Sequence, residues 1–180
     1  DDYHISNLAY QDGVRQGHFL NDDDVPVVNG VVTDGFTNSI GKSLIYRTGG
    51  RVYLAPNVPL ANTMCTTTTW AQGGIGLYLE YEDGYDRFAT EGEGLYTTGT
   101  ARRSAMVIDK ATDQVYLIGT ENSVTVKNFR AAIIQNFSIE EDSLWRGILL
   151  DGGGSTQLRG SGVNISTTRP VPQVVALINP

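Results

Sequence analysis

Residues 148–158, ILLDGGGSTQL, combine residue types that a catalytic or anion-binding turn could use. A short apolar run, Ile148–Leu150, leads to Asp151, and Gly152–Gly154 follow before Ser155. Consecutive glycines weaken a strand or helix, so their presence needs a compensating reason. Backbone amides that no side chain covers can form a nest for an anion, beside a carboxylate from Asp151. The alternative is a turn in which Asp151 only hydrogen-bonds backbone, and the residues alone favour neither interpretation.

Two neighbouring arginines, Arg102 and Arg103, lead into the apolar run 104–108. Successive side chains of a strand point to opposite faces, so at most one of the pair can face a given cleft. We expect the other in solvent. A guanidinium at the start of a strand suits bidentate contact with a phosphate or a carboxylate, and the plain alternative is a surface ion pair.

Other motifs that could carry chemistry fail on spacing. Five residues separate Gly35 from Gly41, where a phosphate-binding P-loop needs four, and the LIYR that follows is typical of a strand. His4 and His18 are the only histidines and have no zinc-ligand spacing. The acidic run NDDDVP at 21–26 lacks the ligand pattern of an EF-hand and is interpreted as a solvated turn. We predict no metal site and no cofactor, with a divalent cation such as calcium left open.

The composition restricts the class of protein. A chain of 180 residues, 40% hydrophobic and 18% charged, is typical of one globular domain. Thirteen basic residues against twenty acidic ones give a net charge of -7, which argues against a nucleic-acid partner. No apolar run approaches the roughly 20 residues that a membrane span requires. Cys65 is alone, which excludes an intramolecular disulfide.

The elements that would position the candidate residues are mostly strands. Apolar alternation and β-branched residues predict strands at 25–32, 43–46, 51–55, 75–81, 104–108, 115–119, 148–150 and 174–178. Turn residues at 48–50, 83–84 and 110–113 predict hairpins, hence antiparallel pairing. The segment 56–69, which carries two prolines, is expected to cross between strands.

One segment has helical periodicity. In SVTVKNFRAAIIQNF, apolar residues recur at spacings of three and four, which predicts an amphipathic helix near residues 124–137. Ser123 or Thr125 could serve as its N-cap. The predicted fold class is therefore α+β, a mostly antiparallel β-sheet with one main helix.

Five motifs occur together in a recognisable order: VPVVNG at 25–30, WAQGGIGLYLE at 70–80, ARRSAMVID at 101–109, ILLDGGGSTQL at 148–158 and TTRPVPQVVALI at 167–178. In this order they resemble the phosphodiester glycosidase family, which includes N-acetylglucosamine-1-phosphodiester alpha-N-acetylglucosaminidase and relatives linked to exopolysaccharide. The resemblance divides the chain into an N-terminal segment, 1–24, of unknown role and a phosphodiester glycosidase-like domain, 25–180.

The motifs match the family to different degrees. Residues 150–155 match its Leu-Asp-Gly-Gly-Gly-Ser signature without change. The family's Arg-Thr-Ala stretch is similar to residues 103–105, which selects Arg103 over Arg102. Its terminal arginine looks like Arg169. Residues 29–32 keep only the first two positions of Asn-Gly-Gly-Phe-Phe, so the identity of the sugar cannot be carried over.

The resemblance implies hydrolysis of a sugar-1-phosphodiester, with glycosyl C–O cleavage that releases free sugar and a phosphomonoester. Asp151 would act as general base or stabilise positive charge at the anomeric carbon. Arg103 and the amides of Gly152, Gly153 and Gly154 would stabilise the leaving phosphate. A second carboxylate, if used, would be Glu93 or Glu91.

Substrate binding would add the two residues that match the start of the first motif, Asn29 and Gly30, and the turn residue Ser155. The implied partner is a sugar-phosphate or glycopolymer substrate. The chain starts at Asp1 without a methionine or a signal-peptide pattern, so we expect it to be part of a larger polypeptide or assembly. We expect an extracellular, cell-surface or phage-particle location.

The competing interpretation is a non-catalytic module that binds a carbohydrate or a partner within a larger surface or phage structural protein. Fold alone does not establish chemistry. The altered motif at 29–32 favours this interpretation, whereas the unaltered run 151–155 and Arg103 favour the enzyme.

Overall fold

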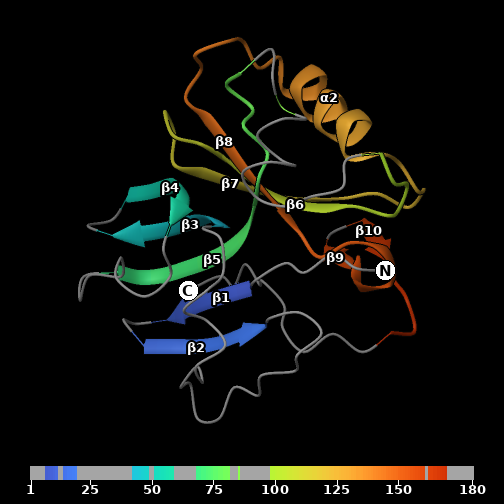
Figure 1. Cartoon of the computed structure of the whole chain (residues 1–180), viewed down its shortest axis with the longest axis horizontal. Coiled ribbons are helices and arrows are strands. Elements are labelled where there is room, and N and C mark those ends of the chain that lie inside the picture. The colour runs from blue at the N-terminus through green and yellow to red at the C-terminus, as the bar shows by residue number, and fades with distance from the viewer. Residues whose placement is uncertain are drawn as a thin grey trace.

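In the part of the chain that the structure describes, a mainly antiparallel sheet carries one helix packed on it (Figure 1). The computed structural model describes residues 74–81, 85, 98–160 and 162–169 in full, and residues 7–11, 14–19, 42–48, 51–58 and 68–73 as strand backbone. The elements in chain order are β1 (Asn7–Gln11), β2 (Val14–Phe19), β3 (Lys42–Thr48), β4 (Arg51–Val58), β5 (Thr68–Gly76), β6 (Ser104–Asp109), β7 (Gln114–Gly119), α2 (Val126–Phe137), β8 (Trp145–Leu150), the 3₁₀ turn η3 (Gly153–Ser155), β9 (Leu158–Gly160) and β10 (Val163–Ile165).

Strand β5 joins the two parts of the main sheet. The strand order is β2-β1-β5-β8-β6-β7, with β3 also paired to β5 and to β4. Residues 70–72 of β5 pair with both β1 and β3, and its end, Ile75-Gly76, pairs with β8. Every strand pair described is antiparallel. The predicted fold class, α+β with a mostly antiparallel sheet, is confirmed.

Most predicted strands on described residues are present. β3, β4, β6, β7 and β8 contain the predicted runs, and each is longer than predicted. Two of the predicted hairpins are confirmed, because Thr48 pairs with Arg51 and Asp109 pairs with Gln114. The predicted strands 25–32 and 174–178 and the turn at 83–84 lie outside the described residues.

The predicted strand 75–81 is wrong beyond its first two residues, because β5 ends at Gly76. Arg130, a buried residue of α2, donates from Nε to the Leu77 carbonyl at 2.8 Å and from Nη2 to the Tyr78 carbonyl at 2.7 Å. The Leu77 amide still donates to the Gly147 carbonyl of β8 at 2.9 Å, but the Leu77 and Tyr78 carbonyls bind the guanidinium instead of strand amides. The apolar alternation over residues 75–81 therefore indicates which side chains are buried, but not where the strand pairing ends.

The predicted crossing segment 56–69 is shorter in the structure. β4 continues through Pro56 to Val58, and β5 begins at Thr68. The register between β3 and β4 shifts near the end of β4, because Leu44 pairs with Ala55 whereas Lys42 pairs with Val58. A proline is tolerated within a strand at such an irregularity, because it removes no ladder hydrogen bond there.

The first 24 residues contain two strands that the sequence reasoning missed. Gln11 of β1 pairs with Val14 of β2, and Asp12-Gly13 lie between them in the sequence. An Asp-Gly pair between two extended runs is a strong signal for a two-residue hairpin. Because Ala9 pairs with Gln72 of β5, this segment belongs to the same sheet as the rest.

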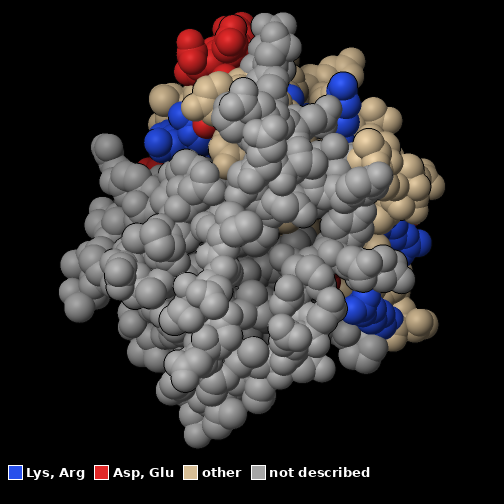
Figure 2. All heavy atoms as spheres, in the orientation of Figure 1, with Lys and Arg blue, Asp and Glu red and all other residues tan. Residues whose placement is uncertain are grey.

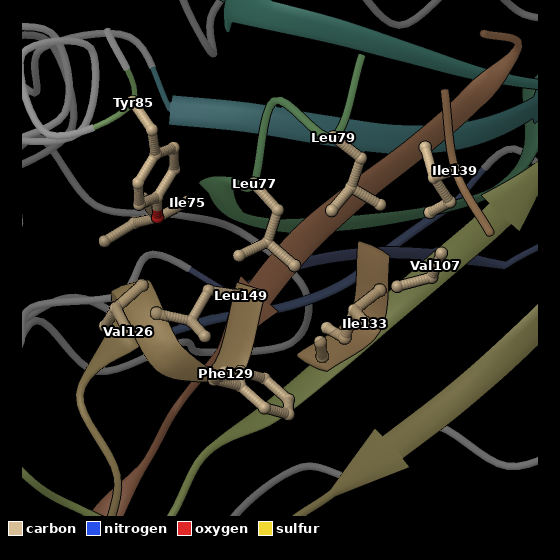
Figure 3. Close-up of a cluster of buried hydrophobic side chains, with 11 residues drawn as sticks. Ile75, Leu77, Leu79, Tyr85, Val107, Val126, Phe129, Ile133, Ile139 and Leu149 are labelled. Atoms are coloured by element: carbon tan, nitrogen blue, oxygen red, sulfur yellow. The ribbon is translucent and has the colours of Figure 1, made fainter. Parts of the chain in front are cut away.

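The main core lies between α2 and one face of the sheet (Figure 3). Helix residues Val126, Phe129 and Ile133 are buried, as the periodicity predicted. They share one cluster with the following residues of the sheet and its connections: Ile75, Leu77, Leu79, Tyr85, Ala105, Val107, Ile139 and Leu149. Met106 and Ile108 alternate with Ala105 and Val107 and belong to a second cluster with Ile148. Both faces of β6 are therefore buried, which holds its first residue in a set position.

Helix α2 begins at Val126 and takes Thr125 as its N-cap, one of the two candidates from the sequence. The Thr125 hydroxyl accepts a hydrogen bond from the Asn128 amide at 3.1 Å. We expect Thr125→Ala to lower the free energy of unfolding by about 1 kcal/mol, because a helix amide loses its acceptor. Urea unfolding followed by circular dichroism measures this. Ser123→Ala serves as the control, and an equal loss there would contradict the cap assignment.

Candidate functional site

The glycine-rich turn follows β8 and is tied to the residues that precede β6. The Gly153 amide donates to the Arg102 carbonyl at 2.9 Å, and the Ser104 hydroxyl donates to the Asp151 carbonyl at 2.6 Å. A Cβ on Gly152 would lie only 2.8 Å from the Arg102 carbonyl oxygen. Glycine at 152 is therefore required by the close approach of two backbones.

The turn offers fewer amides than the sequence predicts. The Gly153 amide cannot take part in an anion-binding nest, because it already donates to the Arg102 carbonyl. The Ser155 amide donates to the Gly152 carbonyl at 3.0 Å and closes η3. No acceptor for the amides of Gly152 and Gly154 lies in the described part of the chain. These two amides are the ones that could bind a ligand.

An open pocket of about 370 Å³ lies over this turn. Its lining comes from four segments that are distant in the sequence: Thr100, Ala101, Arg102, Ser123, Gly153, Gly154 and Thr167. Three hydroxyl groups, one guanidinium and the backbone of two glycines suit a ligand that carries both hydroxyls and an anion. No carboxylate is among these described lining residues.

Arg102, rather than Arg103, lines the pocket. The Arg102 guanidinium donates from Nε to the Glu121 carbonyl at 2.9 Å and from Nη1 to the Ser166 carbonyl at 3.2 Å. Both acceptors are neutral carbonyls, so the positive charge of Arg102 is not cancelled by them. The side chain thus joins the loop before α2 to the segment after β10 while it lines the pocket.

Arg103, the arginine selected from the resemblance, is 2% exposed. Its Nε donates to the Val124 carbonyl at 3.2 Å and its Nη2 to the Gly99 carbonyl at 2.6 Å. The expectation that the arginine outside the cleft lies in solvent is wrong, because Arg102 lines the pocket and the Arg103 guanidinium is buried against backbone carbonyls. Gly99 and Val124 adjoin the pocket residues Thr100 and Ser123, so Arg103 supports two walls of the pocket.

Asp151 follows directly on β8 and is partly buried. Its backbone carbonyl is held by Ser104, whereas no donor to its carboxylate is found among the described residues. Within the described structure, the alternative of an aspartate that hydrogen-bonds nearby backbone amides therefore finds no support. In the sequence, Asp151 is two residues before Gly153, the first glycine that lines the pocket.

Three of the predicted site residues, Asn29, Gly30 and Glu93, lie outside the described residues, as does the alternative Glu91. Of the others, the structure brings Asp151 and the glycine turn together with the Arg102–Ser104 segment. Their roles as substrate contacts stay predictions.

The segment 166–169 was missed as a part of the site. The Thr167 hydroxyl donates to the Gly154 carbonyl at 2.6 Å, and Gln157 Nε2 donates to the Arg169 carbonyl at 2.9 Å. Thr100 and Ser123 lie in none of the five motifs, and Thr167 begins the motif 167–178 without being selected by it, because hydroxyl residues are common in loops. Only their meeting at one turn makes them candidates.

No group of three or more residues of His, Cys, Asp and Glu that could hold a metal ion occurs in the described part of the structure. No described helix is both long enough and apolar enough to cross a membrane. Comparison of the chain with protein-family models finds no match, and comparison with curated proteins finds none either. The fold and the pocket define the class of this protein: an α+β protein whose pocket is lined by a glycine turn and an arginine.

Proposed function

We propose that the chain hydrolyses a sugar-1-phosphodiester at the glycosyl C–O bond and releases free sugar and a phosphomonoester. One observation carries the proposal: Gly153 and Gly154 of the DGGGS turn line a pocket together with Arg102 and three hydroxyl residues, and Asp151 precedes these glycines in the same turn. Guanidinium and backbone amides suit the phosphate, and hydroxyls suit the sugar.

The chemistry assigns a role to each part. Asp151 accepts a proton from the attacking water, the water oxygen bonds to the anomeric carbon, and the phosphate oxygen leaves with the electron pair of the broken C–O bond. Arg102 and the Gly154 amide stabilise the charge that develops on this oxygen. A phosphate is already an acidic leaving group, so it needs less help from a general acid than a sugar hydroxyl does.

Arg103 takes a positioning role in this proposal, because its contacts with the Gly99 and Val124 carbonyls support the walls of the pocket. Asn29 and Gly30 would contact the sugar or the phosphate. Glu93 would supply a second carboxylate if the reaction uses one. These last three assignments rest on the resemblance to phosphodiester glycosidases.

A second candidate function is the non-catalytic binding of a sugar phosphate within a larger assembly. The observation that favours it is the lack of a carboxylate among the described lining residues. A pocket of this kind could hold a phosphorylated glycan without cleaving it.

A panel of sugar-1-phosphodiesters tests the proposal. Methyl phosphodiesters of glucose, mannose and N-acetylglucosamine, in both anomeric forms, are incubated with the protein in isotopically labelled water. We expect free sugar that carries the label, together with unlabelled methyl phosphate, because water attacks carbon rather than phosphorus. Label in the phosphate would overturn the proposed bond cleavage. Binding of the sugar phosphates without turnover on any substrate would favour the second candidate.

A further inference from the structure

Arg169 lies against the glycine turn, although the proposed function does not use it. A Cβ added to Gly154 would lie 3.2 Å from Cδ of Arg169 and 3.8 Å from its Nη1. The arginine side chain therefore crosses the turn at the position where a larger residue at 154 would stand. Glycine at this position lets a second guanidinium approach the pocket.

The backbone of Arg169 is held in place by hydrogen bonds. Its amide donates to the Thr167 hydroxyl at 3.1 Å, and its carbonyl accepts from Gln157 Nε2 at 2.9 Å. The Thr167 hydroxyl in turn donates to the Gly154 carbonyl at 2.6 Å. The side chain thus starts from a fixed point beside the turn, which reduces the entropy lost when it binds a ligand.

The positive charge on this side of the molecule is not neutralised by described carboxylates. Arg169 is exposed and has no ion pair among the described residues. Arg102 binds the backbone carbonyls of Glu121 and Ser166, which are neutral. Figure 2 shows acidic side chains over the loop between α2 and β8 with basic side chains beside them, and further basic side chains near β9 and β10. That loop carries the exposed residues 140–142. In a chain of net charge -7, two arginines beside one glycine turn without an ion pair among the described residues suit an anionic ligand.

We propose that Arg169 and Arg102 together select a phosphate group with two negative charges, so that the pocket binds a phosphomonoester more tightly than a phosphodiester. This inference rests on the proposed function. The leaving phosphate gains its second charge as the glycosyl bond breaks, and a pair of guanidiniums therefore stabilises the transition state more than the substrate. The same preference makes the phosphomonoester product an inhibitor.

Calorimetric binding at pH 8 tests the proposal with methyl phosphate and dimethyl phosphate. The second pKa of a phosphomonoester is about 6, so methyl phosphate is a dianion at this pH, whereas dimethyl phosphate carries one charge. We expect methyl phosphate to bind at least about 10-fold more tightly, and Arg169→Gln to weaken its binding by about 10-fold with little effect on dimethyl phosphate.

Arg159→Gln is the matched control, because Arg159 is an exposed arginine of β9 that neither lines the pocket nor is among the atoms nearest to a Cβ at Gly154, as Arg169 is. Equal affinity for the two phosphates, or an equal loss in Arg159→Gln and Arg169→Gln, would overturn the proposal. These binding measurements need no turnover. If the protein has no activity but selects the dianion through Arg169, the proposed hydrolysis is refuted and this inference stands. If it is active without such selectivity, the proposed hydrolysis stands and this inference is refuted.

Discussion

Replacing Arg103 with methionine is expected to lower the free energy of unfolding by about 3–5 kcal/mol, the largest effect of any single substitution considered for stability. The side chain is 2% exposed, and its guanidinium binds the Val124 carbonyl at 3.2 Å and the Gly99 carbonyl at 2.6 Å. Methionine has a comparable length but no donor, so the Gly99 carbonyl loses the guanidinium and the Val124 carbonyl keeps only the Ala101 amide, at 3.2 Å. Urea unfolding of the purified variant measures the loss.

Arg102→Met is the matched control for this prediction. Arg102 also donates to two carbonyls, but its contacts are exposed, and water can replace the lost donors. We expect its free energy of unfolding to fall by less than about 1.5 kcal/mol. The decisive result is that Arg103→Met lowers the free energy of unfolding more than Arg102→Met does. A stable Arg103→Met protein that has lost sugar-phosphate binding would return Arg103 to the substrate role that the resemblance implies.

Asp151→Asn is expected to lower kcat on the best phosphodiester of the panel by about 100-fold or more, while sugar-1-phosphate binding changes little. The amide cannot accept a proton from the attacking water. The backbone carbonyl that Ser104 holds is unaltered by the substitution, so the turn should persist. Steady-state kinetics give kcat, and unfolding curves for the variant show whether the fold is intact.

Asp142→Asn provides the control at the other end of β8. Asp142 is exposed and has φ 57°, a left-handed conformation that asparagine tolerates as well as aspartate does. This variant should keep both activity and stability. If Asp151→Asn retained activity within about three-fold of the wild type, the carboxylate would have no part in proton transfer, and Asp151 would be a turn residue only.

The strand and helix pattern could be predicted because it depends on near neighbours in the chain. Alternation in 104–108 and 115–119 and the turn at 110–113 are local features, and the hairpin of β6 and β7 contains all of them. The helix follows from spacings within one segment, and its N-cap from the choice between two nearby hydroxyl residues. The end of β5 could not be predicted, because Arg130 binds the carbonyl of Leu77 from 53 residues further along the chain.

By itself, the sequence determined the α+β class, the strands β3, β4, β6, β7 and β8 in their order along the chain, and the glycine turn that carries Asp151. Only the tertiary structure decided which arginine faces the pocket. Arg102 and Arg103 are neighbours with the same chemistry, but backbone carbonyls at Gly99 and Val124 surround the second guanidinium, whereas the first lines the open pocket. Tertiary structure also brought Ser123, Thr167 and Arg169 to the turn, because contacts between distant segments depend on packing and not on local pattern.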